Sequence, residues 1–209
     1  MKPARGWVAQ SVLVLCGALS CDAGALAAAQ VYRLTPTHSF VHFAWNHAGL
    51  STLRGRFDKV SGHIRFDRQA RLGQGRVELR LDSVNTGRPA LDAALRRALG
   101  ATGATLANVE IVALRFDGDR PGAALGRLSL GSIDLPIRLK TVHFNCYLNP
   151  LLLREVCGGE FETELDPSTL GLALDPAFDL HGPIRLQVQV ESIRQDPEQD
   201  EDADAAPSS

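Results

Sequence analysis

Apolar and polar residues alternate along much of this chain, most clearly at residues 40–47, 76–84, 128–130 and 184–190. A period of two places successive side chains on opposite faces of a β-strand. Strands with one apolar and one polar face are typical of antiparallel sheets that are covered on one side only. The pattern therefore predicts an all-β domain.

The alternation slips by one residue at two places. Phe57 lies at an odd position and Val60 at an even one, and the same change occurs between Leu139 and Val142. Because a one-residue slip turns the following side chains to the other face, we expect a β-bulge within each pair. Bulges coil long strands, and eight or nine strand candidates are enough to close a barrel that holds one small ligand. The predicted fold is an eight-stranded antiparallel β-barrel.

One segment follows a helical pattern instead. Pro89 suits a first helical turn, Leu91 and Leu95 lie at helical spacing, and Gly100 gives a stop signal. We expect one short amphipathic helix near a barrel mouth. Its basic side chains either face a phosphate or an anionic membrane, or form an ordinary solvated face; they are Arg88, Arg96 and Arg97.

The first 29 residues have the pattern of a secretory signal peptide. A short positive region precedes an apolar core at residues 8–19, and three alanines then stand before Gln30. The core is too short for a membrane span of about 20 residues. We therefore expect export to the periplasm with cleavage near Ala29. An alternative makes Cys21 the acylated first residue of a lipoprotein.

Cleavage would leave a domain at residues 30–194 and an acidic tail at residues 195–209. The tail has no apolar residue larger than alanine, so it cannot bury enough surface to offset its ordering entropy, and we expect it to be disordered. The whole chain has 22 basic and 24 acidic residues. Nothing in this balance indicates a nucleic acid partner, which would require a basic stripe.

Two cysteines would remain after cleavage, Cys146 and Cys157. In an exported protein such a pair predicts a disulfide. The turn signal Asn149-Pro150 between them would place the cysteines on facing strands of a hairpin. A redox-active pair is disfavoured, because C-x-x-C spacing and a neighbouring helix terminus are both absent.

The histidines do not form a recognisable metal-binding pattern. His38 and His42 are four residues apart, which on a strand is roughly 13 Å and too far for one zinc ion. Ser39 follows His38 directly, and strand neighbours point to opposite faces, so the two do not form a nucleophile and base. We expect no metal, no cofactor and no catalytic residue, and interpret His38 as a structural residue at a strand start.

Three groups of residues occur in an order and spacing that match a known family. The first is Tyr32, His38-Ser39, Val41, Phe43, His47, Gly49, Gly55, Phe57, Gly62 and Phe66-Asp67. The second is Leu128-Ser129-Leu130, Pro136-Ile137 and Leu139, and the third is residues 161–171 with Ser168 and Gly171. In these motifs, over about residues 31–194, the chain resembles the YceI family of exported polyisoprenoid-binding proteins.

The resemblance implies a lipocalin-like barrel that holds a long isoprenoid chain, such as a quinone tail or a polyprenyl phosphate, in an apolar tunnel. The family usually carries D-x-H-L-R-S-x-D-F-F at the helix, whereas residues 92–100 lack the histidine, the second aspartate and the phenylalanines. We therefore expect different contacts at this mouth. Strand parity predicts the lining residues Val41, Phe43, Trp45, Phe57, Val77, Leu79, Leu81, Leu186 and Val188. Each could equally pack in a filled core, because parity does not show that a cavity remains.

Three functions follow, in order of preference. The first is a periplasmic carrier for an isoprenoid lipid or quinone, with transient contact to a membrane surface or membrane protein and with a dimer as one option for assembly. The second is a non-catalytic envelope stress or interaction protein with a filled barrel. The third is a hydrolase, whose turnover would be lost on His38→Ala. Trp45, which we expect to face inward, would be the only tryptophan after cleavage and thus a reporter of ligand binding.

Overall fold

The computed structural model describes residues 29–101, 103, 105–172 and 174–196. Residues 1–28 of the predicted signal peptide and residues 197–209 of the predicted tail lie outside this part of the chain, so both stay predictions. Among the described residues there are eleven strands and one α-helix, α1 (Pro89–Ala98). The strands are β1 (Gln30–Leu34), β2 (Phe40–His47), β3 (Ser51–Phe57), β4 (Val60–Asp67), β5 (Leu72–Arg80), β6 (Val84–Asn85), β7 (Leu106–Asp117), β8 (Arg120–Leu130), β9 (Ile133–Asn149), β10 (Arg154–Leu165) and β11 (Leu180–Arg194).

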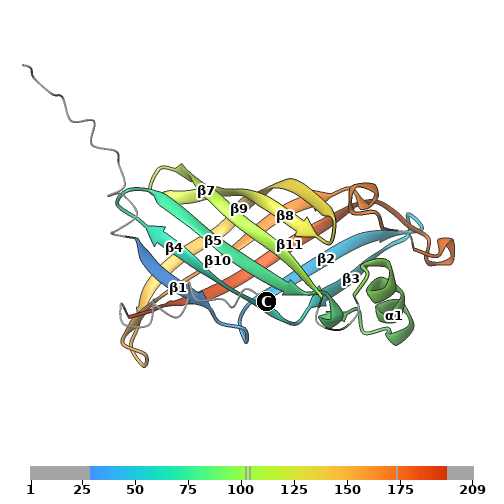
Figure 1. Ribbon diagram of the computed structural model, residues 1–209, viewed down its shortest axis with the longest axis horizontal. Helices are drawn as coiled ribbons and strands as arrows, with labels where there is room; N and C mark the ends of the chain where they lie inside the picture. The colour runs from blue at the N-terminus through green and yellow to red at the C-terminus, as the bar shows by residue number, and fades with distance from the viewer. Residues whose placement is uncertain (1–28, 102, 104, 173, 197–209) are drawn as a thin grey trace, which may run out of the picture.

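These strands fill eight positions around a closed antiparallel barrel (Figure 1). The ring runs β1-β4-β5-β7-β8-β9-β10-β11, and β1 pairs back onto β11. The remaining strands β2, β3 and β6 continue the barrel wall. Strand β2 pairs with β11, β3 pairs with β2, and β6 pairs with β3. The eight-stranded barrel expected from the alternation is therefore confirmed.

Both predicted slips are irregularities of the walls. Residues 58–59 interrupt the strand between β3 and β4, and there Asp58 N donates to the Ser83 carbonyl at 3.2 Å. In the pairing of β9 with β10, Glu160 faces His143 but Phe161 faces Thr141. This register leaves one extra residue in β9, as in a β-bulge, and returns the following side chains to their inward and outward faces.

The two ends of the barrel differ. At the helix end lie α1, the β2–β3 turn (residues 48–50) and the described residues of the β10–β11 connection (166–172 and 174–179). At the hairpin end lie the start of β1, the end of β11 and the turns that follow β4, β7 and β9, opposite α1 in Figure 1. Within the described residues, no helix is long and apolar enough to cross a membrane.

The helix is fixed to the barrel by one carboxylate and by its apolar face. Asp92 accepts hydrogen bonds from the backbone N of Thr86 at 2.7 Å and from the Thr86 hydroxyl at 2.6 Å. Leu91 and Leu95 are buried beneath the helix, as the spacing predicts. Pro89 occupies the first turn, where its missing N–H costs no hydrogen bond.

Aromatic side chains cluster in the interior near the hairpin end. The ring of Phe66 lies 5.7 Å from Phe144, 6.3 Å from Phe116 and 6.4 Å from Tyr32, measured between centroids. The Tyr32 hydroxyl donates to Glu155 Oε2 at 2.9 Å. Burial of the phenol and this hydrogen bond to an anion raise the pKa of Tyr32 to about 12.

Candidate functional site: an apolar interior in two chambers

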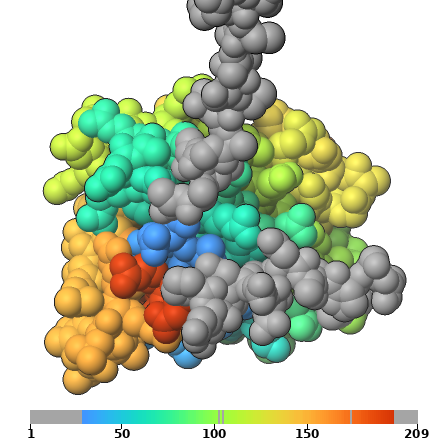
Figure 2. All heavy atoms as spheres, turned by 60° about the vertical axis from the view of Figure 1, so that its left-hand side comes forward, coloured from blue at the N-terminus to red at the C-terminus, as the bar shows by residue number. Residues whose placement is uncertain are grey.

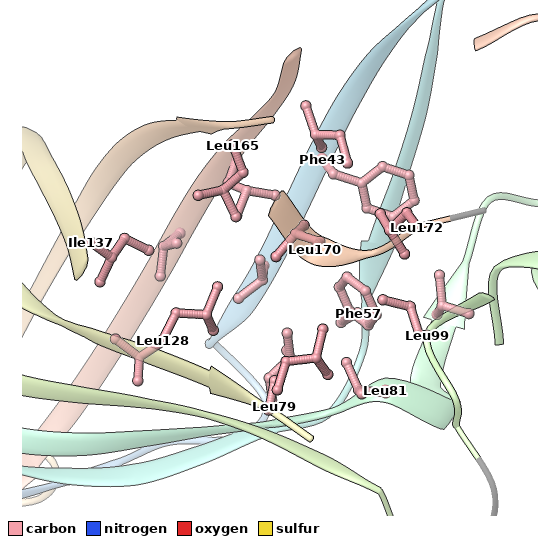
Figure 3. Close-up of a pocket in the computed structure, with 18 of the residues that line it drawn as sticks. Phe43, Phe57, Leu79, Leu81, Leu99, Leu128, Ile137, Leu165, Leu170 and Leu172 are labelled. Carbon is pink, nitrogen blue, oxygen red and sulfur yellow. The ribbon is translucent and has the colours of Figure 1, made fainter. Parts of the chain in front are cut away.

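The barrel encloses an apolar cavity of about 130 Å³, which we call the main chamber. Figure 3 shows its side chains converging from several walls, with Leu170 and Leu172 contributed by the β10–β11 connection. No lining residue carries a polar side-chain atom except the indole of Trp45. Its Nε1 donates to the Gly182 carbonyl at 3.1 Å, so this polar atom already has a partner. The main chamber therefore offers contact with hydrocarbon and no hydrogen-bonding group that would specify a polar ligand.

All nine lining residues predicted from parity surround the main chamber: Val41, Phe43, Trp45, Phe57, Val77, Leu79, Leu81, Leu186 and Val188. Their contact with a ligand stays a prediction. The other lining residues are Val84, Leu95, Leu99, Ala107, Val109, Leu128, Leu130, Ile137, Leu139, Leu165, Leu170, Leu172 and Ile184. Many of these also lie in strands with clear alternation and could have been included on the same grounds. Leu170 and Leu172 could not have been predicted in this way. They lie in an irregular connection, where no regular alternation shows which side chains point inward.

One glycine sets the shape of the chamber wall. Phe43 on β2 faces Gly55 on β3 in the strand register, and its ring lies 5.8 Å from that of Phe57. A Cβ at Gly55 would lie 2.8 Å from Cε1 of Phe43 and 2.9 Å from Cγ2 of Thr86. Since heavy atoms do not approach so closely, only glycine leaves room for the ring of Phe43 at this place.

A second apolar cavity of about 90 Å³ continues the interior toward the hairpin end. The aromatic cluster of Tyr32, Phe66 and Phe144 lines it. The two chambers share Val77, Leu139 and Val188, which we call the waist. The interior is thus two chambers in series, and a long ligand could occupy both only if waist side chains moved apart.

The volumes set a scale for what fits without rearrangement. An apolar cavity of about 150 Å³ accepts one benzene molecule. Chambers of about 130 and 90 Å³ therefore each accept a group of roughly five or six carbon atoms at most. A longer chain requires the barrel interior to expand.

The residues considered for catalysis lie outside the chambers. His38 is exposed in the β1–β2 connection, and its Nδ1 lies 2.8 Å from Glu191 Oε1. The Ser39 hydroxyl is fully buried and bonds only to the backbone of Glu191, donating to its carbonyl and accepting from its N–H. Ser39 is therefore not positioned to attack a substrate, and His38 is a hydrogen-bonded residue before a strand start.

The predicted disulfide between Cys146 and Cys157 is confirmed. The two cysteines face each other in the β9–β10 register, with a Cα–Cα distance of 4.1 Å. Within the described ranges, the one cluster of potential metal ligands consists of these cysteines with Glu155. Because both sulfur atoms are bonded to each other, neither is a thiolate that could bind a metal.

Charges at the helix end are paired with one another rather than directed into the main chamber. Arg80 Nη2 lies 2.6 Å from Asp82 Oδ2, and this hydrogen bond lowers the pKa of the Asp82 carboxyl. Arg96 Nη1 donates to the backbone carbonyl of Asp82 at 3.3 Å. Of the three arginines expected to face a phosphate or a membrane, Arg96 is thus engaged by the protein itself, and the role of Arg88 and Arg97 stays a prediction.

A closed eight-stranded antiparallel barrel with an apolar interior and one short helix at its end is a lipocalin-like architecture. The family model described as "YceI-like domain" matches residues 32–192, and the chain therefore belongs to the YceI-like family. No curated protein matches the sequence.

Solved structures with the same fold come from several bacteria. Burkholderia cenocepacia BcnA has 12% identity and a TM-score of 0.60, with 76% of this chain and 98% of that chain covered. A polyisoprenoid binding domain from Saccharophagus degradans has 18% identity and a TM-score of 0.57, covering 79% and 99%. The YceI protein of Campylobacter jejuni has 19% identity and a TM-score of 0.60, covering 72% and 90%. At these identities the likeness shows the fold alone.

Proposed function

We propose that this protein is a non-catalytic carrier that shields the isoprenoid chain of a lipid or quinone inside its barrel. The observation that carries the proposal is the main chamber, whose lining is apolar throughout and leaves about 130 Å³ unfilled. A core selected for stability alone would be packed to native density, because a void of this size costs about 3 kcal/mol. The name of the solved neighbour from Saccharophagus degradans, a polyisoprenoid binding domain, supports the same ligand class.

The chemistry of the lining fits a branched hydrocarbon. Burial of each CH₂ group contributes about 0.8 kcal/mol, so one five-carbon unit contributes roughly 3–4 kcal/mol before losses. Ordering of the chain and loss of its translational freedom reduce this gain substantially. Because the side-chain donors that line the chambers already bond within the protein, affinity should depend on the hydrocarbon chain more than on the head group.

A filled barrel that serves as an envelope interaction protein is the competing function. The small volume of each chamber favours it, since an isoprenoid with many units fits only after the waist residues Val77, Leu139 and Val188 move. The two functions differ in one measurable respect. A carrier opens in the presence of ligand, whereas a filled barrel does not.

Two measurements test the carrier function. Native mass spectrometry of protein purified without detergent should reveal a bound lipid whose mass fits an isoprenoid. A titration of the mature protein with an isoprenoid quinone and with a polyprenyl phosphate should change the emission of Trp45, which lines the main chamber. Unchanged emission in both titrations, together with protein free of lipid, would exclude the carrier and leave the filled barrel.

We further infer export to the periplasm with cleavage near Ala29. The sequence pattern of the first 29 residues and the Cys146–Cys157 disulfide both support an oxidising compartment. The mass of the mature amino terminus tests this inference. A chain that begins at Gln30 agrees with cleavage by a signal peptidase, whereas an acylated Cys21 would make the protein a lipoprotein.

A further inference from the structure

The β9–β10 hairpin presents three consecutive leucines to solvent. Leu151, Leu152 and Leu153, which we call the leucine tip, form its turn, with 93% of Leu151 and 77% of Leu153 exposed. Leu148, just before the turn, is 67% exposed. Turns usually contain small polar residues, and a contiguous apolar surface at such a place indicates an interaction site.

The leucine side chains do not build the turn. Asn149 Oδ1 accepts hydrogen bonds from the backbone N of Leu151 at 2.9 Å and of Leu152 at 3.1 Å, and the Asn149 carbonyl accepts from Leu153 N at 2.9 Å. None of the three leucines belongs to the hydrophobic core or packs against it. Polar residues would therefore maintain the same turn, so its fold does not explain why leucines occur there.

The hairpin holds the leucine tip in one arrangement. Arg154 pairs with Asn149 directly below the turn, and the Cys146–Cys157 disulfide joins the two strands three pairs further down. A tip that is ordered before contact loses less conformational freedom when it binds. In Figure 2 the hairpin, in orange, forms a projecting corner of the molecule beside the end of β11, in red.

Two ion pairs lie beside the leucine tip. Arg154 is ion-paired with Asp196, and Arg68 Nη2 lies 2.9 Å from Glu155 Oε1. Beyond Asp196 the sequence continues with five acidic residues up to position 204. An apolar tip flanked by ion pairs suits a zwitterionic lipid surface, whereas an anionic surface would repel the acidic residues that follow Asp196.

The beginning of the domain lies at the same end. Gln30, the first residue of β1, pairs with Phe66 immediately before the β4–β5 turn, and Tyr32 bonds to Glu155 two residues beyond the leucine tip. An acyl group on Cys21, nine residues before Gln30, would lie within about 30 Å of this end. A lipoprotein form would therefore keep the start of the domain, at the hairpin end, within about 30 Å of its own membrane.

We propose that the leucine tip inserts into the outer zone of a zwitterionic lipid bilayer and docks the barrel by its hairpin end. A small convex tip fits a flat protein surface poorly, whereas a bilayer accommodates it without a preformed pocket. Tyr147, half exposed and two residues before the end of β9, would lie at the head-group level that tyrosine prefers. This docking site is distinct from the chambers and does not depend on their ligand.

Flotation of the mature protein with phosphatidylcholine vesicles tests the proposal. We expect the wild-type protein to float with the vesicles, and Leu151→Ser/Leu153→Ser to reduce the bound fraction by about tenfold or more, because two exposed leucines no longer enter the hydrocarbon. Leu50→Ser is the matched control, since Leu50 is 88% exposed in the β2–β3 turn at the opposite end. It should bind vesicles as the wild type does.

Three results would overturn the proposal. They are the absence of vesicle binding by the wild type, equal binding by the tip variant, and a loss of binding in the Leu50 variant that equals the loss in the tip variant. Size-exclusion chromatography with light scattering could give a fourth such result, which is a dimer that dissociates on Leu151→Ser/Leu153→Ser. That result would show that the leucine tip binds a second copy of the chain. If the protein binds vesicles but does not bind isoprenoids, the docking proposal stands and the carrier function is rejected.

Discussion

Enlarging one side chain of the main chamber should distinguish a hollow barrel from a filled one. Ala107 on β7 is 3% exposed, lines the chamber and lies between Leu79 of β5 and Leu130 of β8 in the sheet register. The substitution Ala107→Leu adds three carbon atoms at a point where about 130 Å³ is unfilled. The new side chain and a ligand would compete for the same space.

The expected changes have opposite signs for stability and for binding. At about 0.8 kcal/mol per CH₂, filling the void should stabilise the ligand-free protein by about 2 kcal/mol. For a chain of this length that raises the Tm by about 5 °C. The ligand loses the same volume of contact, and about 2 kcal/mol corresponds to a roughly 30-fold weaker Kd.

Thermal unfolding of lipid-free protein by circular dichroism and titration of Trp45 emission with farnesol measure the two quantities. Ala44→Leu makes the same chemical change on the outward face of β2, between the lining residues Phe43 and Trp45, and should leave the Kd unchanged. A fall in Tm for Ala107→Leu would refute the reasoning. Overpacking of an already filled core costs about 1–3 kcal/mol, so that result would identify a barrel without usable space.

Three further predictions concern the wall, the disulfide and the aromatic end. Gly55→Val should displace the ring of Phe43, destabilise the fold by about 1–3 kcal/mol in urea unfolding and weaken ligand binding, whereas a neutral outcome would show that the ring can relocate freely. Replacing both cysteines by alanine should lower the free energy of unfolding by about 3 kcal/mol, as expected for a bridge across a short loop, and equal urea midpoints for the variant and the oxidised wild type would contradict it. The raised pKa of Tyr32, about 12 against 10.0 for the free phenol, means that the folded state retains the phenol proton more strongly, so this contribution to stability is complete below pH 10 and is lost as the pH rises toward 12. Tyr32→Phe should remove that part of the alkaline loss in stability and the late component of the tyrosinate absorbance, and an unchanged absorbance titration would refute the assignment.

The sequence was sufficient to predict the barrel because successive side chains of a β-strand point to opposite faces of the sheet. Parity placed Val41, Phe43 and Trp45 on one face, and all three line the main chamber. The slip between Phe57 and Val60 predicted an irregular wall, which is the break between β3 and β4. These inferences needed only local alternation, which is set by backbone geometry and does not depend on distant contacts.

Two features of the candidate site could not be predicted in this way. The division of the interior at Val77, Leu139 and Val188 depends on how β5, β9 and β11 meet across the barrel, and no local pattern contains that distance. The exposure of the leucine tip could not be predicted from its amino-acid composition. Consecutive leucines normally indicate burial, and only the structure shows that these three are exposed in the turn of the hairpin.

Different side chains line the chambers at the two ends of the barrel. We expected the short helix near a barrel mouth, and at that end Leu95, Leu99 and Leu172 line the main chamber. If the leucine tip docks on a bilayer, the hairpin end faces the lipid, and the first interior side chains that a ligand meets are those of the aromatic cluster around Phe66. A hydrocarbon chain would then enter the smaller chamber first and reach the larger one only through the waist. In that order of events the waist, rather than the helix, determines how many isoprenoid units are taken up, because the first unit fits beside Phe66 and the second requires Val188 and its neighbours to move.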